Sequence, residues 1–233
     1  MLLYEGKAKK LFATDQPNVL RIEYKDDATA FNGQKKETIA GKGKLNNLFS
    51  SHFFELLKSE GIASHFIKKT SETEQLVQKV AIIPLEVIVR NTVAGTLAKR
   101  LGKPEGYHLR SPIVEFCYKN DALGDPLFNE EHIEALEIAT KTEIVSLKEK
   151  ALTINRILMP YFKNFDLDLI DFKLEFGKDD KQNILLADEI SPDTCRLWDT
   201  NTKQKFDKDV FRRDLAPLAE TYQQLAQKLG INL

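Results

Sequence analysis

Three carboxylates and an arginine lie close together in the segment LLADEISPDTCR, residues 185–196. Asp188, Glu189 and Asp193 directly follow an apolar run and come just before Arg196. Like charges packed so closely repel one another unless a cation lies among them. The pattern therefore predicts a site for a cation, or for a cation that carries a phosphate group.

A strand-turn-strand segment overlaps the start of this acidic stretch. In LIDFKLEFG the side chains alternate between apolar and polar, so that Asp171, Lys173 and Glu175 share one face of a strand. The polar turn KDDKQN follows and ILLAD resumes as a strand, which predicts an antiparallel hairpin. A turn of this length predicts that Asp188 faces Lys173 or Glu175, depending on the register, so Asp188 and Glu175 are expected to be neighbours.

Two carboxylates held this close need a proton, a lysine or a divalent metal between them. We favour Mg²⁺ for Glu175 and Asp188, because this ion binds through one or two carboxylates while phosphates and waters complete its octahedron. The alternative is a solvated strand face whose charges have no function.

Lysines near the amino terminus are candidates for phosphate contact. In YEGKAKKLF a glycine turn precedes Lys7 and Lys9, which share a face if the segment is extended. The backbone amides and ammonium groups of such a hairpin can meet the oxygens of a triphosphate. Neither G-x-x-x-x-G-K-[ST] nor G-x-G-x-x-G is present, and an ordinary solvated hairpin is the alternative.

The segment EVIVRNTVAGTLAKRLG predicts a buried strand that delivers Arg90 to its carboxyl end. A helix over 92–101 would offer free amides near Gly95 and Thr96 as a seat for an anion. Arg90 could then reach a carboxylate or phosphate of a ligand; the alternative is an arginine that closes a surface strand. Lys119, in the turn-rich FCYKNDALGDPLFNEEH, is a further candidate for ligand contact.

Periodicity and capping signals place the elements that must position these residues. Residues 1–90 consist mostly of short predicted strands with turn residues between them. One helix interrupts them at 41–61, and we interpret His52 on its apolar stripe as a core histidine rather than a catalytic one. A capping box at Thr140–Glu143 begins a second long helix, and the C-terminal segment predicts one or two closing helices that break near Pro217.

Composition excludes several classes of function. The chain has 34 basic and 35 acidic side chains and a net charge of −1, so no overall field favours nucleic acid or an anionic membrane. No apolar stretch is long enough to span a bilayer and no signal peptide is recognisable, so a cytoplasmic location is expected. The two cysteines and four scattered histidines make a disulfide framework or a zinc site improbable.

Seven segments resemble, in the same order along the chain, those of the phosphoribosylaminoimidazole-succinocarboxamide synthase (SAICAR synthetase) family. They are YEGKAKKLF, TAFNGQKKETIAGKG, VIVRNTVAGTLAKRLG, YKNDALGDPL, DFKLEFG, ADEISPDTCRLWD and DKDVFRRDL. The resemblance implies an α+β fold of two lobes, with a nucleotide cleft like that of ATP-grasp enzymes and kinases. Residues 1–80 would form a mainly antiparallel sheet lobe that covers ATP, and residues 81–233 a larger lobe of sheet and helices.

The resemblance also implies an activity. The family joins L-aspartate to the carboxylate of an imidazole ribonucleotide and cleaves ATP to ADP and phosphate in purine biosynthesis. It implies ATP and Mg²⁺ as cofactors, small-molecule substrates, and a homo-oligomer, commonly a dimer. The implied roles are as follows: Glu175 and Asp188 bind the metal; Lys7, Lys9 and Lys119 contact ATP; Lys173 lies beside the transferred group; Arg90, Thr96 and Arg196 hold the ribonucleotide; Asp193 lies near its imidazole; and Lys35 with Gly41–Gly43 is a candidate for the aspartate.

Two alternatives and one departure accompany this interpretation. The chain could be another ATP-dependent carboxylate–amine ligase with a different acceptor, or a non-catalytic nucleotide sensor, which should lack Lys173, Glu175 or Asp188. A protein kinase is disfavoured because the histidine-arginine-aspartate loop is absent. Cys195 stands where the family pattern leads us to expect a small hydroxyl residue, and no nucleophilic role is expected for it.

Overall fold

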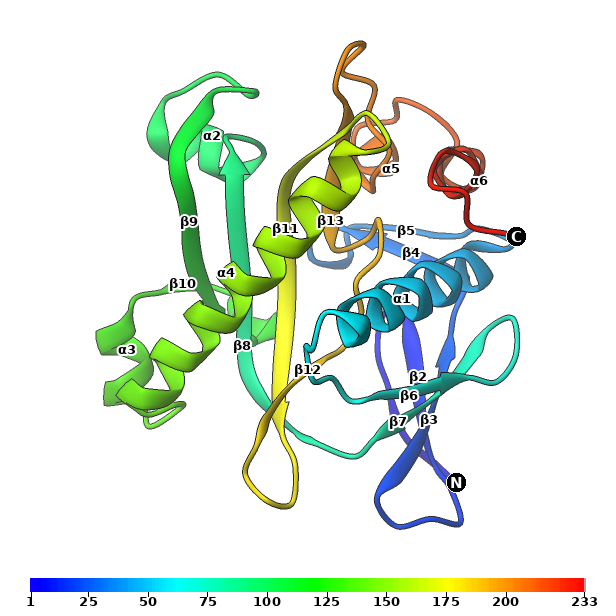
Figure 1. The fold of residues 1–233 in the computed structure, drawn as a ribbon, viewed down its shortest axis with the longest axis vertical. Helices are drawn as coiled ribbons and strands as arrows, with labels where there is room; N and C mark the ends of the chain where they lie inside the picture. Colours follow the sequence, from blue (N-terminus) through cyan, green and yellow to red (C-terminus); the bar gives the residue numbers. More distant parts are fainter. Residues whose placement is uncertain (233) are drawn as a thin grey trace.

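Two antiparallel sheets form the framework of the computed structural model, which describes residues 1–232 apart from the side chain of Asn32. The first sheet has the strand order β1-β2-β3-β7-β6, and the second has the order β10-β9-β8-β11-β12, with β13 paired to β11 (Figure 1). A separate hairpin, β4-β5, follows β3. The predicted α+β class is therefore confirmed.

The elements have the following bounds. The first sheet comprises β1 (Leu2–Glu5), β2 (Lys9–Ala13), β3 (Val19–Tyr24), β6 (Phe66–Lys69) and β7 (Glu74–Gln78), and the hairpin comprises β4 (Asp27–Ala30) and β5 (Lys35–Thr38). The second sheet comprises β8 (Ala81–Thr92), β9 (His108–Tyr118), β10 (Leu127–Phe128), β11 (Leu167–Lys178), β12 (Ile184–Ala187) and β13 (Cys195–Asp199). The helices are α1 (Lys42–Ser59), α2 (Thr96–Leu101), α3 (Glu130–Ala135), α4 (Lys141–Lys163), α5 (Asp209–Arg212) and α6 (Leu218–Lys228), and short 3₁₀ turns are η1 (Phe31–Gly33) and η2 (Asp121–Leu123).

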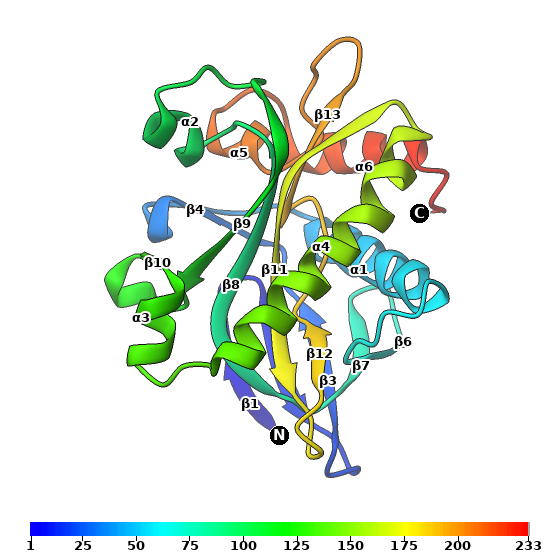
Figure 2. The ribbon, with the colours of Figure 1, turned by 60° about the vertical axis from the view of Figure 1, so that its left-hand side comes forward.

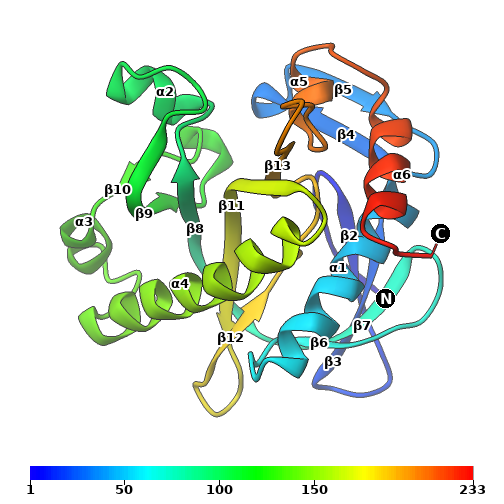
Figure 3. The same ribbon diagram turned by 45° about the horizontal axis from the view of Figure 1, so that its top comes forward.

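The long helices α1 and α4 lie side by side and join the two sheets into one core (Figures 1 and 3). α4 packs on β8 and β11 of the second sheet, and α1 packs on β3 and β6 of the first. Phe53 of α1 contacts Phe162 of α4, with 5.3 Å between the ring centroids. His52 Nε2 lies 2.7 Å from the Tyr161 hydroxyl, so this half-buried histidine has a partner on α4 that the sequence did not reveal.

The capping signals predicted from the sequence are confirmed. The Thr140 hydroxyl accepts a hydrogen bond from the Glu143 amide, and the Glu143 carboxylate accepts one from the Thr140 amide. Pro217 lies at the start of α6, as the predicted break between the closing helices requires. Within residues 1–232, no helix combines the length and apolar composition needed to cross a bilayer.

The hairpin of β11 and β12 forms, but its predicted register is wrong by one residue. Glu175 pairs with Ala187, not with Asp188, because Asp179 closes a tight turn by accepting hydrogen bonds from the amides of Lys181 and Asn183. Regular pleating would then aim Asp188 away from the Glu175 face. Instead Asp188 has a left-handed backbone, with φ 60°, and this turn brings its carboxylate back to that face.

The chain crosses from the first sheet to the second between Gln78, which ends β7, and Ala81, which begins β8. This crossing supports our proposal that two lobes divide near residue 80. The strands on both sides of it contribute residues to one cleft.

Candidate active site

A cleft with a volume of about 620 Å³ lies where the two sheets meet, and the residues predicted from the sequence to bind ATP, the metal and the ribonucleotide line it. Apolar side chains of the first sheet, among them Leu20, Ile22 and Val77, wall one part of it. Arginines that include Arg196 and Arg212 line another part. The predicted residues that line the cleft are Lys7, Lys9, Arg90, Thr96, Lys119, Lys173, Glu175, Asp188, Asp193 and Arg196.

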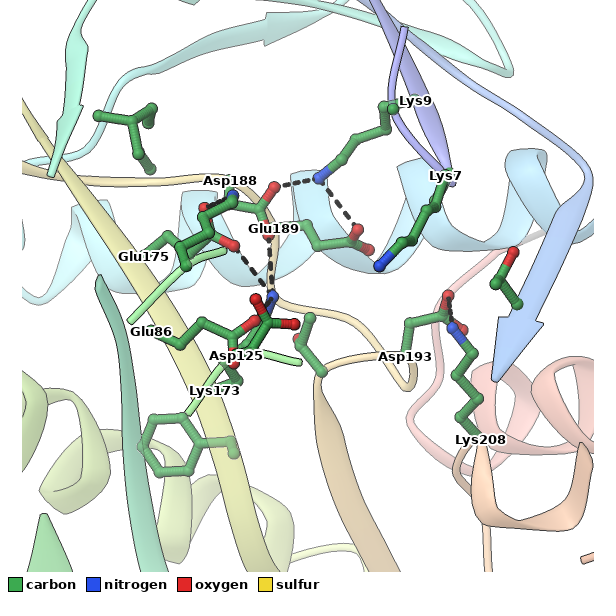
Figure 4. Close-up of a pocket in the computed structure, with 18 of the residues that line it drawn as sticks. Lys7, Lys9, Glu86, Asp125, Lys173, Glu175, Asp188, Glu189, Asp193 and Lys208 are labelled. Carbon is green, nitrogen blue, oxygen red and sulfur yellow. Dashed lines mark hydrogen bonds and ion pairs between the residues drawn. The ribbon is translucent and has the colours of Figure 1, made fainter. Parts of the chain in front are cut away.

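The ammonium group of Lys173 lies among three carboxylates (Figure 4). Its Nζ is 2.9 Å from Glu175 Oε1, 3.1 Å from Glu86 Oε1 and 4.0 Å from Asp188 Oδ2. Burial disfavours this ammonium, but the surrounding carboxylates outweigh the burial and hold the pKa of Lys173 well above its usual value. Of the three species that could separate Glu175 from Asp188, the structure therefore places a lysine there.

Two further lysines complete this lysine–carboxylate cluster, which comprises Lys9, Glu86, Lys119, Lys173, Glu175, Asp188 and Glu189. Lys9 is paired with Asp188 and lies 3.0 Å from Glu189 Oε1. Lys119 is paired with Glu175. Burial opposes ionisation of Asp188, but Lys9, Lys173 and Lys119 together hold the pKa of its carboxyl far below the usual range. Three lysines thus lie among four carboxylates in this cluster.

Lys7 lies outside this cluster, at the rim of the cleft. Its Nζ is 2.7 Å from Asp121 Oδ1, and both side chains are exposed. Lys7 lies in the turn between β1 and β2, whereas Lys9 begins β2. Both ammonium groups reach the cleft, but they meet different carboxylates.

The carboxylate oxygens of Glu175 and Asp188 suit Mg²⁺ only if a nucleotide supplies further ligands. Glu175 and Asp188 offer hard carboxylate oxygens around one shared ammonium, and Mg²⁺ needs only one or two protein carboxylates when a nucleotide contributes phosphate oxygens. No cluster of three or more histidine, cysteine or acidic side chains suited to a metal occurs in residues 1–232. A metal here would depend on the nucleotide for its remaining ligands.

Two arginines converge on Asp171 in another part of the cleft. Arg90 and Arg196 each place a guanidinium nitrogen 2.9 Å from Asp171 Oδ2. Arg90 Nε also lies 2.6 Å from Glu115 Oε2, and Arg196 Nε lies 3.0 Å from Asp209 Oδ2. Both arginines are thereby held in fixed positions by carboxylates, and both line the cleft.

The predicted anion seat beside them is partly wrong. β8 runs to Thr92 and α2 begins only at Thr96, because the intervening segment turns through Gly95, with φ 55°. The Gly95 amide donates to Glu105 Oε1 at 3.0 Å, so a carboxylate of the chain occupies that amide. Gly95 is needed for close approach: a Cβ there would lie 2.6 Å from a guanidinium nitrogen of Arg196. Thr96 itself is exposed in the cleft.

Asp193 is held by two lysines and a tyrosine. Its carboxylate lies 2.8 Å from Lys42 Nζ and 3.1 Å from Lys208 Nζ, and it accepts a hydrogen bond of 2.6 Å from the Tyr222 hydroxyl. Figure 4 shows Asp193 and Lys208 at the margin of the pocket. Burial opposes ionisation of Asp193, but Lys208 and Lys42 prevail and keep the pKa of its carboxyl far below the usual range.

We expected Lys35 and the segment 41–43 to face the cleft and bind aspartate, but these residues do not line it. Lys42 is fully buried behind Asp193, and Lys35 donates to the Phe211 carbonyl oxygen and to Asp214. Neither lysine lines the cleft in the part of the chain that the structure describes. Their ammonium groups are already used in contacts within the protein.

The chain matches the model of the SAICAR synthetase family over residues 2–229. It is 64% identical to the phosphoribosylaminoimidazole-succinocarboxamide synthase of Anoxybacillus flavithermus over 229 residues, which cover 98% of this chain and 95% of that protein. This chain belongs to the SAICAR synthetase family.

Solved structures of SAICAR synthetases have the same fold. The crystal structure of the synthase from Ehrlichia chaffeensis superimposes with a TM-score of 0.97, at 46% identity, and covers 100% of both chains. A SAICAR synthetase in complex with ADP superimposes with a TM-score of 0.95, at 51% identity, and covers 98% of this chain and 97% of that chain. The two-lobed fold implied by the sequence resemblance is therefore confirmed.

Two residues of the cleft, Glu86 and Lys208, were not identified as site residues from the sequence. Glu86 lies directly opposite Glu175 on neighbouring strands, and only the pairing of β8 with β11 brings them together. Lys208 comes from the segment before α5 and reaches Asp193 across 15 positions of the sequence. Cys195, the departure from the family pattern, is buried, and burial raises the pKa of its thiol.

Proposed function

We propose that this member of the SAICAR synthetase family joins L-aspartate to the carboxylate of 5-amino-1-(5-phosphoribosyl)imidazole-4-carboxylate, with cleavage of ATP to ADP and phosphate. The observation that carries the proposal is that the lysine–carboxylate cluster and the paired arginines, Arg90 and Arg196, line one cleft in a chain of this family. One part of that cleft suits a triphosphate and another a second anion. Lys173, Glu175 and Asp188, one or more of which a non-catalytic sensor should lack, are all present.

The charges of the cluster suggest how the nucleotide is held. Lys9 and Lys119 now neutralise Asp188 and Glu175, and a triphosphate that entered the cleft would offer these lysines stronger anionic partners. Glu175 and Asp188, released in this way, could hold Mg²⁺, which would supply positive charge to the phosphates. Lys7, at the exposed rim, would add a further phosphate contact.

The ribonucleotide is assigned to the arginine-rich part of the cleft. Arg196 and Thr96 would bind its phosphate, because the guanidinium lies against Gly95 and the Thr96 side chain is exposed beside it. Arg90 would bind an anionic oxygen nearer the reacting carboxylate. Asp193, held as a carboxylate, would accept a hydrogen bond from the amino-imidazole.

The chemistry requires activation of a carboxylate, because an amine cannot displace oxide. An oxygen of the substrate carboxylate forms a bond to the γ-phosphorus of ATP, and the bond from that phosphorus to the β–γ bridging oxygen breaks, which releases ADP. The aspartate amine then attacks the acyl carbon and loses a proton, and inorganic phosphate leaves. Lys173, with its ammonium fixed among carboxylates, would stabilise the transferring group in line with the acceptor.

The remaining parts of the proposal rest on family membership. We propose a homodimer, a cytoplasmic location, and lobes of residues 1–80 and 81–233. Gel filtration with light scattering would test the dimer, and a subunit mass of 26.6 kDa predicts a particle of twice that mass.

Release of ADP tests the activity directly. ADP should appear only when ATP, the imidazole ribonucleotide, L-aspartate and Mg²⁺ are all present, and another amino acid in place of aspartate should not support it. Glu175→Ala and Asp188→Ala should each lower kcat by about a hundredfold or more, since the loss of one preorganised charge typically costs about 3 kcal/mol in the barrier. Both variants should remain folded by circular dichroism.

A matched control removes a carboxylate far from the cleft. Glu134 is exposed on α3 and pairs only with Lys141 on the surface, so Glu134→Ala should leave turnover within about twofold, because exposed ion pairs contribute little. Full turnover in Glu175→Ala or Asp188→Ala would contradict the assigned roles of these carboxylates. Turnover with a different amine would identify another carboxylate–amine ligase.

A further inference from the structure

His65 is a buried histidine in the wall of the nucleotide cleft. The residue is 3% exposed, and its ring packs edge-on against Phe54, with 5.3 Å between the ring centroids. Its backbone amide and its Nδ1 both lie within hydrogen-bond distance of the Leu186 carbonyl oxygen, at 2.8 and 3.1 Å. The ring is therefore fixed in one orientation, and it lines the cleft.

The partner of Nδ1 determines which ring nitrogen carries the proton. A carbonyl oxygen can only accept, so Nδ1 must donate, and Nε2 of the neutral ring is an acceptor. Burial lowers the pKa of His65 to about 4: the carboxylates of Asp188 and Glu175 favour the charged ring and Lys9 disfavours it, but burial dominates. At neutral pH Nε2 is thus a bare acceptor, and no group in residues 1–232 donates a hydrogen bond to it.

The surroundings of His65 are those of a base-binding pocket. Its carbonyl oxygen accepts from the Gln78 amide, which places it beside Val77 in the apolar wall that also contains Leu20 and Ile22. His65 also contacts the Leu186 carbonyl oxygen, and the next residue in the chain, Ala187, lines the cleft. If phosphates bind at the lysine–carboxylate cluster, the flat apolar base must lie against this wall.

We propose that His65 Nε2 accepts a hydrogen bond from the exocyclic amine of adenine and thereby selects ATP over purine triphosphates with a carbonyl at position 6. This inference rests on the proposed function only for the placement of the phosphates. A carbonyl oxygen facing Nε2 would set two acceptors against each other beside a buried ring, and neither would have a donor. A site built to bond a ligand N–H rejects an analogue that lacks it.

The wild-type protein tests the idea without any substitution. ATP, purine riboside triphosphate and inosine triphosphate carry an amine, a hydrogen and a carbonyl at position 6, and inosine triphosphate also carries a proton on N1. We expect kcat/KM to fall in that order, with inosine triphosphate about ten- to a hundredfold below ATP. Equal use of inosine triphosphate and ATP would overturn the assignment.

The variant His65→Asn isolates the ring nitrogen. Its shorter amide can still donate to the Leu186 carbonyl oxygen but cannot place an acceptor at the position of Nε2. We expect the preference for ATP over inosine triphosphate to fall to within about threefold of unity, while the KM for the ribonucleotide stays unchanged. The matched control His108→Asn changes an exposed histidine of β9 that does not line the cleft, and it should keep the wild-type preference.

Binding measurements separate this proposal from the proposed reaction. Calorimetric titration of ADP and inosine diphosphate needs no turnover, and the wild-type protein should bind ADP about ten- to a hundredfold more tightly. Selective ADP binding without ADP release from ATP would refute the proposed reaction and leave the role of His65 intact. An unchanged preference in a folded His65→Asn protein would refute that role.

Discussion

Lys42 is a buried lysine whose ammonium group contacts the Asp193 carboxylate. A fully buried ammonium is costly, and Lys42 is also the first residue of α1, where the helix dipole disfavours a cation. Its ammonium lies 2.8 Å from Asp193, which reaches the cleft from the other side. We infer that Lys42 is a positioning residue: it and Tyr222 hold Asp193 from behind while Lys208 contacts it at the margin of the cleft.

Substitution of Lys42 by methionine tests this role. With one of its cations removed, the pKa of Asp193 should rise, because Lys42 helps Lys208 to hold it low against the effect of burial. The acidic limb of the pH profile of kcat/KM should therefore move to higher pH, and kcat/KM for the ribonucleotide should fall about tenfold or more. The KM for ATP should change little.

Lys42→Arg provides the matched comparison, since it retains the charge. It should recover part of the activity and place the acidic limb between those of wild type and Lys42→Met. A purely structural lysine would lower the folded fraction in both variants without moving the pH profile, and that result would contradict the positioning role.

At the scale of elements, α4 supports the strands that carry charged residues of the cleft. It packs on both β8, which bears Glu86 and Arg90, and β11, which bears Lys173 and Glu175. The capping box of Thr140 and Glu143 fixes where this helix begins. The helix thereby sets the back surface against which the site is built.

Loss of the cap should destabilise the protein without altering its chemistry. Thr140→Ala removes the hydroxyl that accepts from the Glu143 amide, and we expect the free energy of unfolding to fall by about 1 kcal/mol. Urea denaturation measures this change, and kcat per folded molecule should be unchanged. Thr153→Ala, in the middle of the same helix, is the control and should change stability by less than about 0.5 kcal/mol.

The same elements show what could be predicted from the sequence. The long helices could be located because caps and apolar periodicity are local signals, as at Thr140 and along the buried face of α4. The pairing of Glu86 with Glu175 could not, because it depends on which strands adjoin and in which register. The carboxylate of Asp188 was expected near Glu175 and is there, but through a left-handed backbone turn rather than through strand pairing.

At the scale of the whole molecule, charges from distant parts of the chain close the two sheets around one cleft. Lys9 of the first sheet pairs with Asp188 beyond β12, and Lys35 of the β4–β5 hairpin pairs with Asp214 beyond α5. Figure 2 shows β4 running below the segment that carries α5 and α6. Strong acidification should loosen the contact between the sheets, because the pair of Lys9 and Asp188 needs an ionised carboxylate and the pKa of Asp188 lies far below its usual range.

One buried carboxyl acts in the opposite sense on stability. Asp207 is fully buried and accepts from the amides of Leu197 and Asp209, yet burial and the nearby Asp209 carboxylate raise its pKa to about 7. Since the pKa of this group is higher in the folded than in the unfolded protein, the folded state binds more protons between about pH 4 and pH 7. The contribution of Asp207 to stability is therefore greatest near pH 4 and is lost as the pH rises through 7.

Asp207→Asn should remove this pH-dependent loss, because an amide does not ionise. Its single carbonyl oxygen can keep one of the two backbone hydrogen bonds, and the other is lost at every pH. We expect the variant to gain stability relative to wild type as the pH rises from 5 to 8, by about 2–4 kcal/mol at the upper end. Thermal and urea denaturation of both proteins across this range measure the difference. Parallel pH dependences would mean that Asp207 is ionised throughout and that its two amide donors outweigh its burial, whereas a difference that grows with pH would place the titrating proton on this carboxyl.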